Sequence, residues 1–304
     1  MVGSAAAGYD ASRSDMAVKH FHPESSDDRW WQAAMTVEGK IGNFDLTYVF
    51  SHLKRDVDSE SDYGYWYDAL AGYGAYFYDN SGALVNPSQY IQATDGYRRT
   101  SHELRIASPQ DNRVRVVAGV FWQQQEHQIH QRYRIDNLAD VLSVSGWPNT
   151  IWLTQQERKD RDQAVFGQVS FDATDKLELT AGGRWFKTSN SLKGYFGFAN
   201  GYSSGSSLDP VDRYGEAGCY AQYGAKSNWV SFEGAPCVVV DKGVKESDAT
   251  YRLNATWKID DKKLVYATWS QGFRPGGINR RGTLPPYVSD FLTNYELGWK
   301  TSWA

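Results

Sequence analysis

The chain has 304 residues, which suits one large all-β domain or two ordinary domains. Aromatic residues make up 15% of it, with 20 Tyr and 12 Trp, but no apolar run approaches the roughly 18 residues of a membrane-spanning helix. A helical membrane protein is therefore excluded. The formal net charge of −4 and the lack of any Lys/Arg block argue against a nucleic-acid partner.

The beginning of the chain shows no strand pattern. Residues 1–15, MVGSAAAGYDASRSD, lack both the basic and the apolar region of a signal peptide. If the protein is exported, we expect its export signal to lie outside this chain. We interpret residues 1–28 as the end of a loop before the first strand.

Apolar and polar residues alternate with a period of two in most of the rest, which predicts strands. A soluble β-sandwich also alternates in this way. Here, however, the apolar face is rich in small residues and ends in aromatics, as the lipid-facing surface of a membrane β-barrel does. We expect eight apolar residues to face outward: Leu46, Tyr48, Val116, Val120, Leu179, Leu253, Trp257 and Leu297.

The alternation predicts about nine antiparallel strands. They lie near residues 29–38, 43–54, 97–108, 113–132, 160–172, 176–196, 246–259, 263–273 and 291–303. The links between them alternate strictly between short polar turns and long connections. The short links are 39–43, 109–112, 172–176 and 260–263, and the long links are 55–96, 133–159, 197–245 and 274–290.

This alternation of link lengths favours a bacterial outer-membrane barrel with short periplasmic turns and long extracellular loops. A sandwich has no reason for it. Single-chain bacterial barrels have even strand numbers, so an odd count of about nine indicates a portion of a larger barrel, formed here by residues 29–303. Several predicted strands are long enough to project beyond the membrane.

Several segments resemble the barrel of TonB-dependent receptors. They are LVYATWSQGFRPGG at 264–277, NYELGWKT at 294–301, SHELRIAS at 101–108, VRVVAGVFWQ at 114–123 and the tract 30–61. The resemblance implies a barrel of about 22 strands closed by an N-terminal plug. It also implies uptake of ferric siderophores, or else of cobalamin or oligosaccharides, driven by the TonB complex of the inner membrane.

The sequence departs from that family pattern, because no plug, TonB box or closing C-terminal strands are recognisable in it. We expect the partners to be outer-membrane lipid, the plug of the full-length chain, the TonB complex acting through that plug, and the solute. We expect the protein to reside in the outer membrane of a Gram-negative bacterium.

An aromatic loop at 62–78, DYGYWYDALAGYGAYFY, is the main candidate for solute contact. Its rings can stack on sugars or catecholates, or pack on each other or at lipid headgroups. The candidate residues are Tyr63, Tyr65, Trp66, Tyr67, Tyr73 and Tyr76. Arg274 in GFRPGG is a further candidate. However, Pro275 and the following glycines favour a structural role for this segment, in which the strand ends and the loop begins.

Charged residues on the polar strand faces are expected to line the lumen. We favour cross-strand pairing for them, with plug contact as the alternative. They are Glu103, Arg105, Arg113, Arg115, Glu178, Arg184, Arg252 and Glu296.

Cys219 and Cys237 lie in one long link of a chain expected to be exported, which predicts a disulfide, with two unpaired thiols as the alternative. His127 and His130 are three apart on a strand and face opposite sides, so we expect no metal site and no cofactor. No catalytic motif such as G-x-S-x-G or H-E-x-x-H occurs, so we expect that the protein is not an enzyme. A soluble carbohydrate-active β-protein and a passive porin or adhesin stay open as rivals.

Overall fold

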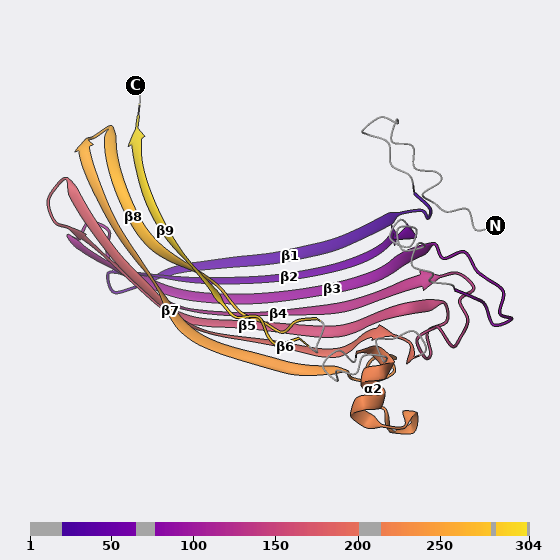
Figure 1. Ribbon diagram of the computed structural model, residues 1–304. Coiled ribbons are helices and arrows are strands. Elements are labelled where there is room, and N and C mark those ends of the chain that lie inside the picture. The colour runs from indigo at the N-terminus through magenta and orange to yellow at the C-terminus, as the bar shows by residue number, and fades with distance from the viewer. Residues whose placement is uncertain (1–19, 65–76, 201–213, 281–283, 303–304) are drawn as a thin grey trace, which may run out of the picture.

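A computed structural model describes residues 20–64, 77–200, 214–280 and 284–302. Within them, nine strands form a single antiparallel sheet in which each strand pairs with its neighbours in sequence (Figure 1). The sheet curves but does not close, because β1 and β9 pair on one side only.

The strands are β1 Ser25–Ile41, β2 Phe44–Asp62, β3 Gln89–Ala107, β4 Val114–Ile135, β5 Thr150–Asp172, β6 Leu177–Phe198, β7 Val240–Asp260, β8 Lys263–Arg274 and β9 Asp290–Thr301. Two short helices, α2 Gly215–Tyr223 and η6 Lys226–Asn228, lie between β6 and β7. Among the described residues, no helix has the length and apolar character to cross a membrane.

The predicted all-β fold and the order of its nine strands are confirmed. Several strands are longer than the alternation indicated. β5 begins at Thr150, whereas the sequence predicted a start at 160. The polar run 154–159 has no period-two alternation, so it was not predicted as strand, but it pairs with both neighbouring strands. β1 begins at Ser25, so residues 25–28 belong to a strand and not to the expected loop end.

The short and long connections lie at opposite ends of the sheet (Figure 1). The first hairpin turns within two residues, and Gly42 has a φ of +62°, a region that favours glycine. The short links of the structure are 42–43, 108–113, 173–176 and 261–262. The long links are 63–88, 136–149, 199–239 and 275–289.

The strand register separates the apolar from the charged positions. Leu253 pairs with Ala181 and Trp269, and these apolar residues share one face. Arg252 pairs instead with Gly182 and Ser270 on the other face. The same register places all eight expected outward residues on the first face, called the apolar face below. Glu103, Arg105, Arg115, Glu178, Arg184, Arg252 and Glu296 lie on the second, called the charged face.

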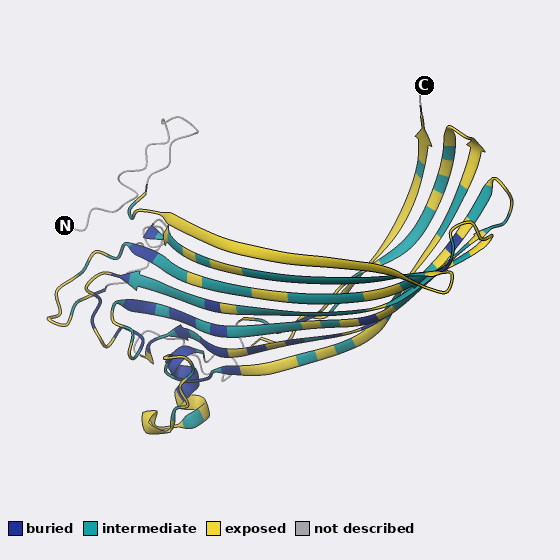
Figure 2. Cartoon of the chain, turned by 180° about the vertical axis from the view of Figure 1, so that it is seen from behind, coloured by how far each residue is buried: buried dark blue, intermediate teal, exposed yellow. Residues whose placement is uncertain are grey.

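The packed core lies at the loop end of the sheet (Figure 2). There, Ile135, Leu138 and Phe77 form one buried cluster, and Leu153 and Tyr195 belong to a second. The middle of the sheet holds little core because it is a single layer. Buried residues therefore gather where the long links fold over the strands.

Candidate functional site

A broad apolar band covers the turn half of the apolar face. On β4 it runs from Val114 to Trp122, a stretch of nine residues. About 9–11 tilted residues carry a strand across a bilayer. The band is exposed: Trp185 retains 56% of its surface and Leu297 82%. A sheet surface this apolar fits contact with lipid better than contact with water.

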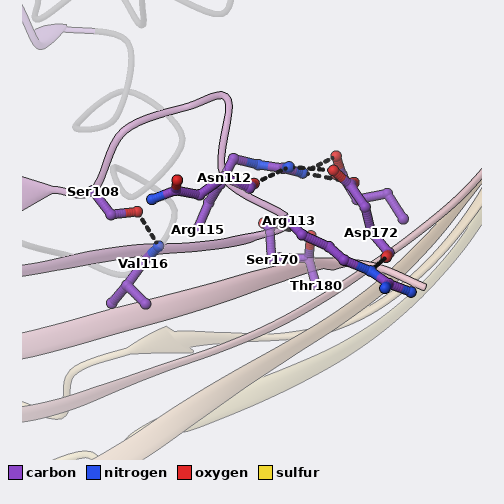
Figure 3. Close-up of polar contacts among 9 residues, drawn as sticks. Ser108, Asn112, Arg113, Arg115, Val116, Ser170, Asp172 and Thr180 are labelled. Atoms are coloured by element: carbon purple, nitrogen blue, oxygen red, sulfur yellow. Dashed lines mark hydrogen bonds and ion pairs between the residues drawn. The ribbon is translucent and has the colours of Figure 1, made fainter. Parts of the chain in front are cut away.

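The charged face has its most concentrated ion-pair network near the turns. Arg115 of β4 donates to Asp172 of β5 at 2.5 Å and to the carbonyl of Asn112 at 3.0 Å (Figure 3). It also donates to Glu178 of β6 at 2.6 Å. Its side chain is only 13% exposed. The network ties three strands together, which is cross-strand pairing and leaves Arg115 few free donors.

Hydroxyl and backbone contacts reinforce this end of the sheet. The backbone N–H of Val116 donates to Oγ of Ser108 at 2.8 Å, and the hydroxyls of Ser170 and Thr180 lie 2.9 Å apart (Figure 3). Arg113 donates to the carbonyls of Asp172 and Ala173 and so holds the β5–β6 turn. These contacts link the turns to the strands at this end of the sheet.

The other candidate lumen charges differ in how fully they are paired. Arg184 donates to Asp162 at 2.7 Å, Arg105 lies 3.6 Å from Glu103, and Glu296 accepts from the hydroxyl of Tyr266 at 2.6 Å. Arg252 has no ion-pair or hydrogen-bond partner among the described residues. Its guanidinium donors are therefore available to bind another group.

The long link 275–289 folds back over the charged face. Its backbone N–H groups at Ile278 and Gly276 donate to Oδ1 of Asn190 at 2.7 Å and to Oε2 of Glu246 at 2.9 Å. The carbonyl of Arg280 accepts from Gln156 at 3.1 Å. Asn190, Glu246 and Gln156 come from β6, β7 and β5, so this loop, called the inner loop below, crosses three strands.

A charged pocket of about 310 Å³ lies beside the inner loop. Asp160 accepts hydrogen bonds there from Arg158 and from Asn190. Asp162 uses one carboxylate oxygen for Arg184, while its other oxygen is buried without a partner. The pocket can hold a polar group of either sign, since both guanidinium and carboxylate groups line it.

Sequence reasoning missed the three residues that hold the inner loop. Gln156 and Asn190 lie in polar runs where no alternation stands out, and Glu246 was placed only as the start of a strand. Arg274, proposed for solute contact, forms an ion pair with Asp290 across the end of the β8–β9 hairpin. Its side chain is nevertheless 81% exposed.

A disulfide and a buried carboxylate stabilise the links 136–149 and 199–239. Cys219 of α2 and Cys237 form a disulfide within the second link. Glu216, only 5% exposed, accepts from the backbone N–H of Ser145 at 2.7 Å and of Asn200 at 2.9 Å. One buried carboxylate therefore clamps two loops together. The sequence offered no signal for this role, because Glu216 lies 71 residues from Ser145.

The aromatic loop is described only at its ends. Tyr65, Trp66, Tyr67, Tyr73 and Tyr76 lie outside the described residues. Tyr63 packs edge-on against Tyr133, with ring centroids 5.4 Å apart, and Phe77 is buried in the first cluster. Nearby, hydrogen bonds from the Ser81 hydroxyl and the Ala83 backbone hold the pKa of Asp79 below its usual value.

The histidines serve in ring contacts and ordinary hydrogen bonds. His127 stacks on Tyr97, with centroids 4.0 Å apart, and contacts Asp95 at 3.0 Å. The register places His127 and His130 on opposite faces. In the described part of the chain, no three His, Cys, Asp or Glu side chains gather as a metal site.

Comparisons with known proteins agree with this architecture. The family model "TonB dependent receptor-like, beta-barrel" matches residues 4–304. The ferric yersiniabactin uptake receptor FyuA from Yersinia pestis is similar in structure, with a TM-score of 0.56 and 14% identity over 92% of this chain. The siderophore receptor PiuA from Acinetobacter baumannii gives a TM-score of 0.54 and 11% identity, also over 92%.

At these identities the two structures share the fold with this chain, and the chain spans 34% and 38% of their respective lengths. The open sheet is accordingly a portion of a barrel wall. Because the family model matches nearly the whole sequence, the chain belongs to the TonB-dependent receptor family and forms part of its β-barrel.

Proposed function

We propose that the full-length protein is an outer-membrane active transporter for a ferric siderophore, with residues 25–301 forming part of its barrel wall. The observation that carries the proposal is the two-faced sheet: an exposed apolar band on one side and ion pairs with a folded-in loop on the other. A barrel with lipid outside and an aqueous, occupied lumen needs this arrangement. Family membership and the siderophore receptors of the same fold support the choice of solute.

The charged face then has two roles. Arg115, Arg184 and Glu296 maintain the wall, since each already has a partner on this face. Arg252, which has none among the described residues, is the best candidate for contact with the plug. Guanidinium groups suit such a contact because they donate to carboxylates and carbonyls in a fixed geometry.

Solute binding belongs to the loop end of the sheet, where the long links lie. Tyr63 and the aromatic residues of 65–76 offer stacking surfaces, and Arg274 adds a cation near the inner loop. The pocket beside the inner loop lies on the route from these loops into the lumen. Inward release would require the TonB complex, acting through the plug of the full-length chain.

Growth and uptake of the full-length protein under iron limitation, in strains with and without the TonB complex, test this function. We expect siderophore-dependent uptake that disappears without that complex. Uptake that persists unchanged would identify a passive pore. TonB-dependent uptake of an oligosaccharide or cobalamin instead of iron would identify an alternative substrate, and the aromatic loop favours the oligosaccharide.

Cell fractionation tests the location separately. We expect the protein in the outer-membrane fraction, from which only detergent extracts it. Recovery in a soluble fraction without detergent would favour the rival hypothesis of a carbohydrate-active β-protein.

A further inference from the structure

We infer that Arg161, Lys187 and Lys245 form a binding site for the phosphorylated headgroup of an outer-leaflet lipid on the apolar face of β5–β7. The inference rests on the membrane location in the proposed function, although not on the transported solute. It concerns a surface that faces away from the lumen and the loops.

The three cations lie where the apolar band ends. On β6 the band ends at Trp185, and the next residue on that face is Lys187. On β5, Val165 is followed on the same face by Gln163 and Arg161. On β7, Ala249 is followed by Ser247 and Lys245. The change from apolar to cationic thus occurs at the same side of the band on all three strands, toward the long links.

The register brings these side chains into one cluster. Arg161 pairs with Ser189, which pairs with Lys245, so both cations flank one serine in the same row. Lys187 lies in the adjacent row, between Gln163 and Ser247. Diagonal neighbours in a sheet lie about 7–8 Å apart, within reach of long side chains. All three ammonium and guanidinium groups can therefore converge on one phosphate-bearing headgroup.

The cluster lacks internal compensation for its charge. Lys187 and Lys245 have no ion-pair partner among the described residues, and Arg161 donates to the neutral Gln124 at 2.7 Å. Three carboxylates near the cluster share this face, and each lies close to another lysine: Glu157 and Glu126 are 3.0 Å and 3.9 Å from Lys159, and Asp241 is 3.1 Å from Lys193. Like charges this close repel one another, so an anion bound between them would relieve an unfavourable interaction.

The surroundings fit a lipid better than a free anion. On the turn side of the cations, Trp185, Val165 and Tyr251 of the apolar band retain 56%, 54% and 54% of their surface. Such an apolar wall can contact acyl chains while the cations bind the phosphate. Aromatic rings with a polar edge prefer the headgroup level of a membrane, and basic residues beside it attract anionic lipids.

The test uses the purified full-length protein and vesicles of phosphatidylcholine alone or with added diphosphorylated lipid A. The test variant carries R161Q, K187Q and K245Q. The matched control removes three cations elsewhere, with K40Q, K226Q and K300Q. Gel migration of unheated samples verifies that each barrel is folded. We expect the test variant to bind lipid A vesicles about tenfold more weakly or worse, and the control to bind like the wild type.

Three further experiments distinguish a lipid headgroup from free phosphate and provide variants that perturb folding less. Dephosphorylated lipid A should lose the advantage over phosphatidylcholine, and millimolar inorganic phosphate should not displace lipid A. The single variants K187Q and K187R provide a milder test, in which the arginine retains lipid A binding.

Equal lipid A binding by the test variant and the wild type would overturn the inference, as would an equal loss in the control. Displacement by inorganic phosphate alone would identify a site for a soluble anion instead. Siderophore uptake should persist in the folded test variant. Uptake therefore tests the transport hypothesis, and lipid A binding tests this inference independently.

Discussion

The backbone N–H of Ile278 donates to Oδ1 of Asn190 at 2.7 Å, across 88 residues of sequence. This bond is buried, and it holds the inner loop against the charged face of β6. Leu192 and Val240 pack against Ile278 in the same place. The loop is thereby part of the inner wall and not an extension into solvent.

The Asn190→Ala substitution should release the inner loop. Losing the acceptor leaves a buried N–H unpaired, which costs about 1–3 kcal/mol. Hydrogen exchange of residues 276–280 in the full-length barrel should rise by one to two orders of magnitude, as about 1.4 kcal/mol corresponds to a factor of ten. Asn254→Ala is the control, because Asn254 bonds Thr268 on a neighbouring strand and not the loop. Unchanged exchange in Asn190→Ala would show that the loop is held by other contacts.

Arginine at position 253 should destabilise the barrel in lipid. Leu253 lies in the apolar band, where a cation near the bilayer midplane costs about 2–4 kcal/mol. Arginine in place of Thr256, which is on the charged face, should cost far less. Unfolding of the full-length protein from lipid vesicles measures both values. Comparable losses at the two positions would contradict the assignment of the faces.

Reduction of the disulfide should loosen the link 199–239 and leave the strands folded. The bond spans a sequence separation of 18, for which chain-entropy arguments allow about 3 kcal/mol of local restraint. Native protein should show no alkylatable thiol, and the reduced protein should show two. Proteolysis of the link should then accelerate. Two freely alkylated thiols in untreated protein would exclude the bond in the folded state.

Arg115 and Arg252 should behave differently when replaced by Ala. Arg115→Ala breaks the network of Asp172 and Glu178 and should lower barrel stability by about 1–2 kcal/mol, discounted because water reaches the lumen. Arg252→Ala should leave barrel stability unchanged. If Arg252 contacts the plug, plug release in the full-length protein should become easier, as limited proteolysis reports. Equal effects of both variants on barrel stability would refute this division of roles.

Deleting residues 65–76 should weaken solute binding without unfolding the barrel. This segment lies between β2 and β3 in the sequence, so the deletion removes no residue of either strand. Tyr63 and Phe77, which pack against described residues, are retained. The deletion should therefore lower the affinity of the full-length protein for the ferric siderophore and leave its heat stability unchanged. Full affinity after the deletion would assign solute contact to other loops.

Several features follow from the sequence alone because they depend on local patterns. The period of two determines which residues share a face, so Leu253 and Arg252 are assigned to opposite sides without coordinates. Short polar links such as 260–263 mark the hairpins and, with them, the order of the strands. β3 and β5 begin at Gln89 and Thr150, earlier than the predicted starts at 97 and 160. Polar side chains on both faces of these first residues leave no alternation to detect.

The arrangement of the long links was decided only by the tertiary structure. Asn190 holding Ile278, and Glu216 joining Ser145 to Asn200, depend on segments brought together by the sheet. None of these residues has a local pattern that distinguishes it from an ordinary polar side chain. The basic cluster of Arg161, Lys187 and Lys245 has the same origin, since only the register between three strands places the side chains side by side. Local periodicity specifies faces, whereas contacts between distant segments specify sites.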